Sequence, residues 1–199
     1  SGALKDRERV VLARRLGRDL VQRLIAGQPV VLLADQDALT RPAKLTFWPQ
    51  WIRGTGTFVE NHPALTGFPH DGFCAYQFIR LFGRDVKTLN LSERGSVERE
   101  KLAPVVWGLS QDNDPDMDTQ WHSSGNRWKI YRHGLICEGR VGEGRLLVCC
   151  LDVLGGIQQR HPEASYLLDC LINYARSPQA APTTPTMTVQ DLRQVFVVE

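Results

Sequence analysis

The chain has 199 residues, 42% of them hydrophobic and 23% charged, with a formal net charge of +2. This length suits one domain with its own core, and the composition is that of an ordinary globular protein. The basic residues are scattered and the net charge is small, which argues against nucleic acid as a partner. No apolar run reaches the roughly 20 residues that cross a bilayer, so we expect no membrane partner either.

The N-terminal part predicts a strand, a helix and a second strand. Residues 9–13 and 30–34 are short apolar runs that suit buried strands. Between them, apolar residues recur at helical spacing, at Leu16, Leu20, Val21, Leu24 and Ile25. Gly27 and Pro29 would end that helix. A single helix over residues 5–26 is the alternative, but a βαβ unit explains both apolar runs.

The middle of the chain predicts a long connection followed by strands. Residues 36–84 show little regular periodicity, and a connection of that length is usually functional or packed as a lid. Residues 86–91 and 102–107 have the composition of strands, with a surface turn predicted at 99–101. Residues 111–127 predict a polar loop.

A hairpin and two helices are expected to complete the fold. Strands over residues 128–138 and 145–153, joined by a glycine-containing turn, predict an antiparallel hairpin. A helix then begins at Pro162 and ends before Pro178. Thr188 can cap a last short helix, which is marginal by itself in water and must dock on other structure. Its apolar residues are Leu192, Val195 and Phe196.

The alternation of strands and helices predicts an α/β sheet with helices on both faces. We expect residues 1–177 to form this domain. Residues 178–199 are then a linker rich in Pro and Thr, followed by the short C-terminal helix.

Residues 54–78 carry the most specific pattern in the sequence. Gly and Pro interrupt this segment every few residues, yet it is rich in aromatic residues and His. It resembles a segment in the C-terminal, non-catalytic domains of family 2 glycoside hydrolases, the β-galactosidase and β-glucuronidase group. Residues 141–153 and 161–174 are similar to the hairpin strand and closing helix of the same domains. The motif residues are His62, Pro63, Phe68, Pro69, His70, Gly72, Phe73 and Gln77.

The resemblance implies both a fold and a role. Those domains have the shape of a class I glutamine amidotransferase, a flavodoxin-like, mostly parallel sheet flanked by helices, here with a C-terminal hairpin. The implied role is a non-catalytic accessory domain that packs on other domains of the same polypeptide, forms oligomer contacts or shapes a cleft. We expect no cofactor. A homo-oligomeric contact and a carbohydrate ligand stay open, as do a cytoplasmic, periplasmic or secreted bacterial location.

Cys74 is the weak catalytic candidate. A small Cys-dependent hydrolase or amidotransferase would need a nucleophile on a tight turn, flanked by small residues and paired with a base. Here Phe73 precedes the Cys and Tyr76 follows it closely, and no Gly-x-Cys-x-Gly pattern occurs. We therefore expect Cys74 to pack in the interior, with Phe73, Tyr76 and Phe78 around its sulfur.

Metal binding has only weak candidates. His62 and His70 with Asp71 do not have a known ligand spacing, and these residues also form turns. Asp112, Asp114 and Asp116 alternate as in a calcium loop. However, Met117 stands where such a loop needs Gly, and Ser123 where it needs a bidentate Glu, so we expect a solvated acidic loop.

Two further groups of residues are candidates for acting on or binding sugars. Glycoside hydrolysis needs two carboxylates that face one sugar. Asp35 and Asp152 end predicted strands, where open α/β sheets place their sites, but each could equally cap a following turn. A carbohydrate-binding module is the remaining alternative, because aromatic rings can stack on sugars, although packing is the usual role of such residues. The Trp residues in predicted loops, or next to them, are Trp48, Trp51, Trp121 and Trp128.

Overall fold

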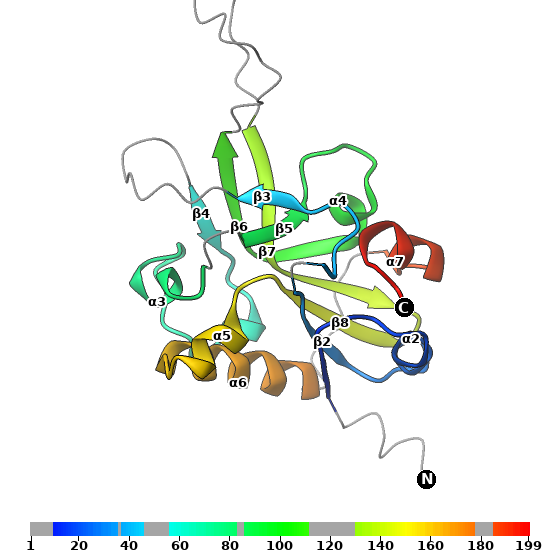
Figure 1. The fold of residues 1–199 in the computed structure, drawn as a ribbon, viewed down its shortest axis with the longest axis horizontal. Coiled ribbons are helices and arrows are strands. Elements are labelled where there is room, and N and C mark those ends of the chain that lie inside the picture. The colour runs from blue at the N-terminus through cyan, green and yellow to red at the C-terminus, as the bar shows by residue number, and fades with distance from the viewer. Residues whose placement is uncertain (1–9, 36, 46–55, 83–85, 112–129, 178–184) are drawn as a thin grey trace, which may run out of the picture.

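The computed structural model describes residues 10–35, 37–45, 56–82, 86–111, 130–177 and 185–199. Within these ranges an eight-stranded sheet lies between two groups of helices (Figure 1). The strands are β1 (Val11–Ala13), β2 (Val30–Leu33), β3 (Ala43–Leu45), β4 (Thr57–Val59), β5 (Val86–Asn90), β6 (Leu102–Gln111), β7 (Ile130–Val141) and β8 (Gly144–Cys149). The helices are α2 (Arg18–Ile25), η1 (Pro63–Leu65), α3 (Tyr76–Ile79), α4 (Val97–Lys101), α5 (Val153–Gln158), α6 (Pro162–Arg176) and α7 (Val189–Val195).

The sheet is mixed. β1 pairs with β2 and β2 with β8 in parallel, whereas β3–β5, β4–β6, β5–β7, β6–β7 and β7–β8 are antiparallel. The expectation of a mostly parallel sheet is therefore wrong. The reason is local for β7 and β8, which are joined by a two-residue turn that can connect only antiparallel strands. Gly142 in that turn has φ +57°, and the predicted hairpin is confirmed.

The βαβ unit predicted at the N-terminus is confirmed. β1 and β2 are parallel neighbours, and α2 connects them. Gly27 follows the helix with φ +103°, the left-handed conformation that glycine adopts most easily. The alternative of one helix across residues 5–26 is wrong for the described part, because β1 occupies residues 11–13.

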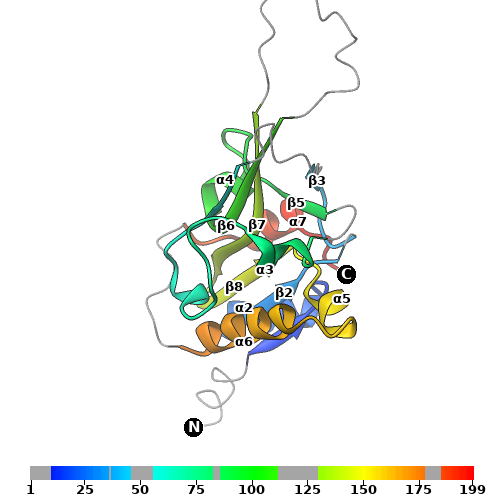
Figure 2. The ribbon, with the colours of Figure 1, turned by 90° about the vertical axis from the view of Figure 1, so that its left-hand side faces the viewer.

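Two cores lie on opposite faces of the sheet. On β2, Val31 and Leu33 point into one core, while Val30 and Leu32 point into the other. The first core is covered by α5 and α6 together with η1 and α3, and the second by α2 and α7 (Figures 1 and 2). Helices on both faces were predicted, and this is confirmed.

Several short elements were missed. The connection over residues 36–84 contributes β3, β4, η1 and α3, and its strands hydrogen-bond to β5 and β6. The turn predicted at residues 99–101 is the end of α4, whose first turn is capped by Ser96 accepting from Arg99 N–H at 3.3 Å. The strand predicted to reach residue 153 ends at Cys149, and α5 begins at Val153. Each is too short for a periodic sequence signal, and each is held by tertiary contact.

The two C-terminal helices follow the prediction. α6 begins at Pro162 and ends at Arg176, before Pro178. Thr188 caps α7 in a capping box with Asp191. The apolar side of α7 is buried in the second core at Leu192 and Val195, as is Phe196 just after it, so the predicted docking is confirmed. No helix of the described ranges is long and apolar enough to cross a membrane.

Candidate functional site

His62 of the motif fixes the long connection to the sheet. It lies just before η1, where its Nδ1 accepts a hydrogen bond from Ala64 N–H at 3.2 Å. Because Nδ1 is an acceptor, the ring proton of the neutral form lies on Nε2, which donates to Glu138 Oε2 at 3.1 Å. The motif His therefore links a loop to β7, 76 residues further along the chain.

Glu138 is the centre of a buried polar cluster. The residue is only 1% exposed, yet Tyr174 of α6 donates to both carboxylate oxygens at 3.0 Å. Arg145 of β8 places Nε 3.0 Å from Glu138 Oε1, and its guanidinium lies over the Tyr174 ring at 4.5 Å. A carboxylate this deeply buried is tolerated only with such partners. The cluster joins the motif loop, the hairpin and α6.

The other polar groups of the motif, unlike His62, form hydrogen bonds within the motif segment itself. Gln77 donates from Nε2 to the carbonyl of Pro69 at 2.8 Å, and His70 Nδ1 accepts from Gly72 N–H at 3.3 Å. Gly72 has φ +85°, and its carbonyl accepts from Val59 N–H of β4. The motif residues Pro63 and Phe68 lie at the first position of η1 and in the first core, respectively. These contacts all shape and anchor the loop.

Cys74 packs against the first core but is partly exposed. Burial raises the pKa of its thiol to about 12, although a hydrogen bond with Thr57 works in the opposite direction. Phe73 and Tyr76, which were expected to lie around the sulfur, are 48% and 77% exposed. Phe78, the third residue of that expectation, is fully buried in the first core. A thiol in this environment is a poor nucleophile.

Large apolar side chains are exposed around α3. Phe73, Tyr76 and Ile79 are 48%, 77% and 40% exposed, and follow one another at three-residue spacing, which on α3 places Tyr76 and Ile79 on one side. Tyr166 of α6, 47% exposed, is tied to the same loop by a hydrogen bond from its hydroxyl to the carbonyl of Gly67 at 2.7 Å. We refer to Phe73, Tyr76, Ile79 and Tyr166 as the α3 patch.

Of the metal-ligand and sugar-stacking candidates, only the His residues of the motif and Asp71 lie among the described residues. His62 and His70 serve the loop contacts given above, and no group of three or more potential ligand side chains occurs within those ranges. Asp112, Asp114 and Asp116 lie outside the described residues, as do Trp48, Trp51, Trp121 and Trp128.

Trp107 on β6 is enclosed by its neighbours on adjacent strands. Phe58 of β4 stacks on it with ring centroids 4.1 Å apart, and Arg132 of β7 lies 4.2 Å from its ring centroid. Since β4 and β7 flank β6 on opposite sides, these two groups cover the two faces of the indole. Its Nε1 donates to Glu60 at 2.6 Å.

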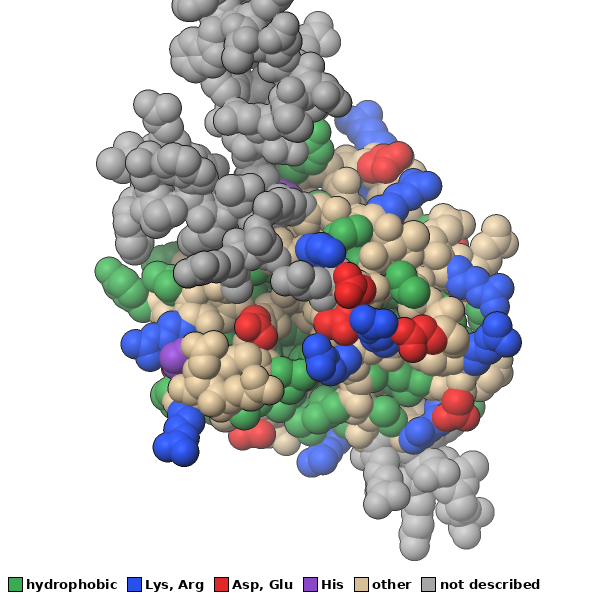
Figure 3. Space-filling view, viewed as in Figure 1, with side chains coloured by type: hydrophobic (Ala, Val, Ile, Leu, Met, Phe, Trp, Pro, Cys, Tyr) green, Lys and Arg blue, Asp and Glu red, His purple; other side chains and the backbone are tan. Residues whose placement is uncertain are grey.

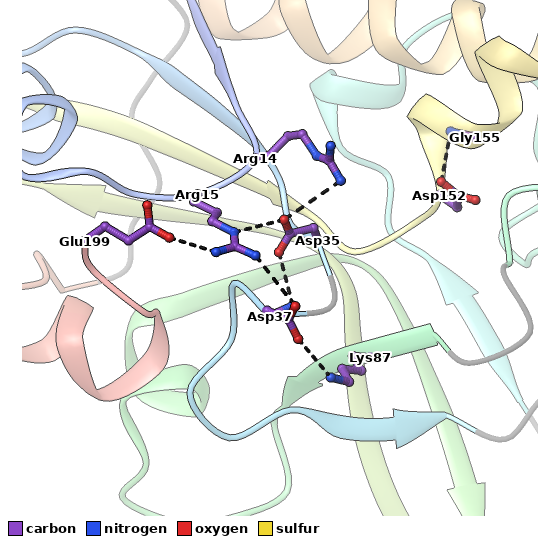
Figure 4. A network of polar contacts seen from close by, with 8 residues as sticks. All are labelled: Arg14, Arg15, Asp35, Asp37, Lys87, Asp152, Gly155 and Glu199. Atoms are coloured by element: carbon purple, nitrogen blue, oxygen red, sulfur yellow. Dashed lines mark hydrogen bonds and ion pairs between the residues drawn. The ribbon is translucent and has the colours of Figure 1, made fainter.

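A second candidate site, separate from the motif at residues 54–78, lies at the carboxyl ends of the parallel strands. A cleft of about 470 Å³ there is bordered by Arg14 and Arg15 after β1, Asp35 after β2, and Asp152 after β8. The sequence placed Asp35 and Asp152 at strand ends without connecting them, and the structure brings both to this one cleft (Figure 4). Open α/β sheets bind ligands at this edge. In Figure 3, acidic and basic side chains lie side by side on this face.

The cleft residues are partly paired with one another. Arg15 Nε lies 3.1 Å from Asp35 Oδ2, and its Nη1 lies 2.8 Å from Glu199 Oε1. Burial opposes ionisation of Asp35, but hydrogen bonds from Arg15 and Asp37 N–H, and the charges of Arg15 and Arg14, outweigh it and lower its pKa. Asp35 is therefore a carboxylate at neutral pH and no proton donor.

The floor of the cleft is aliphatic, and the basic residues of its wall were not predicted from the sequence. Cys150 contributes to the floor, but burial raises the pKa of its thiol well above the ordinary value, and no His is among the described lining residues. Arg14, Arg15 and Lys87 had no sequence signal, because isolated basic residues after strands are common on any surface. Only the structure, which brings these three side chains to one cleft, identifies them as candidate ligand-binding residues.

Comparison with known proteins gives one family match. Residues 118–197 are similar to a family described as "Domain of unknown function (DUF8487)". The match covers less than half of the chain, and includes β7, β8 and the helices after them, but not the motif at residues 54–78. A comparison with curated proteins finds no match.

Proposed function

We propose that this chain is a non-catalytic accessory domain of a family 2-like glycoside hydrolase, and that it packs against other domains of the same polypeptide. The observation that carries the proposal is the use of the motif. Its polar groups bind other groups of the chain: His62 binds the buried Glu138, and Gln77 binds the carbonyl of Pro69 at the surface. A motif used in this way builds a surface and performs no chemistry.

The α3 patch supports the packing role. His62 of the motif binds the buried Glu138, whereas Phe73 and Tyr76 are 48% and 77% exposed. Contiguous exposed apolar side chains commonly mark an interaction site. An occupant from the same polypeptide needs no high intrinsic affinity, because the linkage supplies a high effective concentration.

We also infer an amidotransferase-like (flavodoxin-like) scaffold. The parallel strands β1, β2 and β8, with α2 on one face and α6 on the other, support this inference. The antiparallel pairing of β6, β7 and β8 is the departure from that pattern.

The Cys-dependent alternative is not favoured by the described residues. Burial raises the pKa of both Cys74 and Cys150, which keeps either thiol protonated near neutral pH. A nucleophile would need a lowered pKa and an adjacent base.

A hydrolysis assay tests the non-catalytic part of the proposal. The purified chain is incubated with aryl β-galactosides and β-glucuronides, and we expect no turnover above buffer. Turnover that is lost in an Asp35→Asn variant would contradict the proposal.

Substitutions in the α3 patch test the packing part. In the full-length polypeptide, we expect Tyr76→Ser with Phe73→Ser to lower the melting temperature and to speed proteolysis between domains. The same pair in the isolated chain should leave stability nearly unchanged, since both side chains are exposed. Leu12→Ser, at an exposed apolar residue outside the patch, is the matched control. A full-length polypeptide with no further domain, or one that tolerates the patch substitutions as well as the control, would refute the packing role.

A further inference from the structure

The cleft at the ends of β1, β2 and β8 has the form of a small-molecule site. Its volume of about 470 Å³ falls within the roughly 300–1,000 Å³ of typical ligand pockets. Its floor is apolar, built from Leu33, Val86, Leu151, Val153 and Leu154 among others. Polar side chains converge on it from β1, β2, β5 and β8.

Part of the polar wall is fixed by its own contacts. Arg15 and Asp35 hold each other at 3.1 Å, and Glu199 from the C-terminal end holds Arg15 from the other side at 2.8 Å. Asp37 N–H donates to Asp35 as well. This part of the wall is preorganised, because each of its groups has a defined partner (Figure 4).

Other groups retain capacity to bind a ligand. Arg14 has a side chain that is 67% exposed, and its Nη2 lies 3.9 Å from Asp35 Oδ2. Lys87 Nζ lies 3.7 Å from Asp37 Oδ1. Asp152 accepts from Gly155 N–H through Oδ1 at 2.9 Å, and among the described residues no cation pairs with it. These three groups therefore offer donors and acceptors of both signs to the cleft.

The charges of the wall balance. Arg14, Arg15 and Lys87 oppose Asp35, Asp37 and Asp152, so the formal charges of the lining residues that the structure describes sum to zero. An anionic ligand would meet three carboxylates, and a cationic ligand three bases. A hydroxyl group both donates and accepts, and can therefore satisfy an Asp and an Arg at once.

We propose that this cleft binds a small, neutral, hydroxyl-rich ligand, a monosaccharide or cyclic polyol. Its hydroxyl groups donate to Asp152 and Asp37 and accept from Arg14 and Lys87, and its C–H groups lie on the aliphatic floor. The site is one of binding, and no bond of the ligand is broken. It is independent of the α3 patch and of the packing role proposed above.

A matched set of sugars tests the charge argument. Backbone amide shifts of the isotopically labelled chain are followed while D-glucose, myo-inositol, D-glucuronate or D-glucosamine is added. We expect saturable shifts at the residues after β1, β2 and β8 with at least one of the two neutral compounds. The anionic and cationic analogues should bind more weakly than D-glucose.

Two substitutions test the assignment of residues. Asp152 is the N-cap of α5, and Asp152→Asn preserves this capping and removes the charge, because Asn caps as well as Asp. We expect this change and Arg14→Gln each to weaken binding by roughly two- to tenfold, the effect of one net hydrogen bond. Asp19→Asn and Arg176→Gln, on α2 and α6 outside the cleft, are the matched controls and should bind like the wild type.

Several outcomes would overturn the proposal. These are the absence of shifts at the cleft with either neutral compound, binding of D-glucuronate or D-glucosamine at least as tight as that of D-glucose, and cleft variants that bind like the controls. The outcomes of the hydrolysis and packing assays have no bearing on this test, so the two proposals fail separately.

Discussion

At the scale of single residues, Glu138 has the most consequential environment in this protein. It is a buried carboxylate that contacts a loop, a neighbouring strand and a helix through His62, Arg145 and Tyr174. A buried ion pair adds little net stability compared with apolar residues of the same shape, but removal of one partner leaves the other charge buried and unpaired. Removal of Glu138 alone should therefore cost more stability than replacement of the whole ion pair by apolar residues.

We predict that Glu138→Ala lowers the free energy of unfolding by about 3–5 kcal/mol, because Arg145 is left without its carboxylate. Glu138→Leu combined with Arg145→Met should recover a substantial part of that loss. Urea unfolding of both variants measures the effect. Glu143→Ala, in the exposed turn of the hairpin, is the control. A Glu138→Ala variant as stable as the control would show that the cluster is not a structural link.

We predict that Cys74 in the folded chain reacts with iodoacetamide more slowly than a free thiol at neutral pH. Its pKa of about 12 leaves only a minute fraction of thiolate. Mass spectrometry locates the adducts, and the unfolded chain in urea serves as the reference for complete access. Preferential labelling of Cys74 in the folded state would instead favour the Cys-dependent alternative.

At the scale of elements, α7 is stabilised by charge at its N-terminus. Asp191 accepts from Thr188 N–H at 2.7 Å, and Lys101 of α4 places Nζ 2.7 Å from the same carboxylate oxygen. The hydrogen bond from Lys101, together with that from Thr188 N–H, lowers the pKa of Asp191 despite some opposing burial. The capping box thus also links α7 to α4.

We predict that Asp191→Asn destabilises the protein by about 1 kcal/mol at neutral pH, the usual size of a capping effect. Because the folded-state pKa of Asp191 is lowered, its contribution is present above the unfolded value near 3.8 and is lost as the pH falls through the folded value. The difference from wild type should therefore shrink in acid. Unfolding curves at neutral and acidic pH measure it, with Asp169→Asn on α6 as the control. A difference that does not depend on pH would contradict the role of the charge.

At the scale of the whole molecule, the C-terminal segment completes the second core. Val197 N–H donates to the carbonyl of Ala38, and Glu199 N–H to that of Leu16, both at 3.0 Å. The end of the chain thus lies between two N-terminal segments. Glu199 also holds Arg15 at the cleft, so the C-terminus supports the candidate binding site directly.

We predict that Phe196→Ala lowers stability by about 3–5 kcal/mol, the usual cost of removing a buried aromatic ring. Val197→Ala, at the next residue, should change stability much less, by about 0.5 kcal/mol, because Val197 is 41% exposed. Thermal unfolding of both variants provides the comparison. Equal effects of the two substitutions would mean that α7 does not dock as described.

Hydrophobic periodicity in the sequence by itself determined the regular elements. The βαβ unit, the hairpin, α6 and α7 were all predicted, because their apolar residues repeat with the period of a helix or a strand, and because Gly27, Pro162 and Thr188 mark their ends. The short elements β3, β4, α3 and α5 carry no such repeat. They form only because neighbouring strands and helices supply their hydrogen bonds and packing.

The candidate sites also contain residues that the sequence predicted and partners that only the tertiary structure supplied. The His62 motif could be recognised from its order of residues, but its partner Glu138 could not, because 76 positions separate them and no local pattern connects them. Asp35 and Asp152 could each be placed at a strand end, whereas their meeting with Arg14 and Lys87 in one cleft depended on strand order. Strand order is set by long-range pairing, since β8 returns beside β2 after more than a hundred residues. Only the tertiary structure decided which charges face one another.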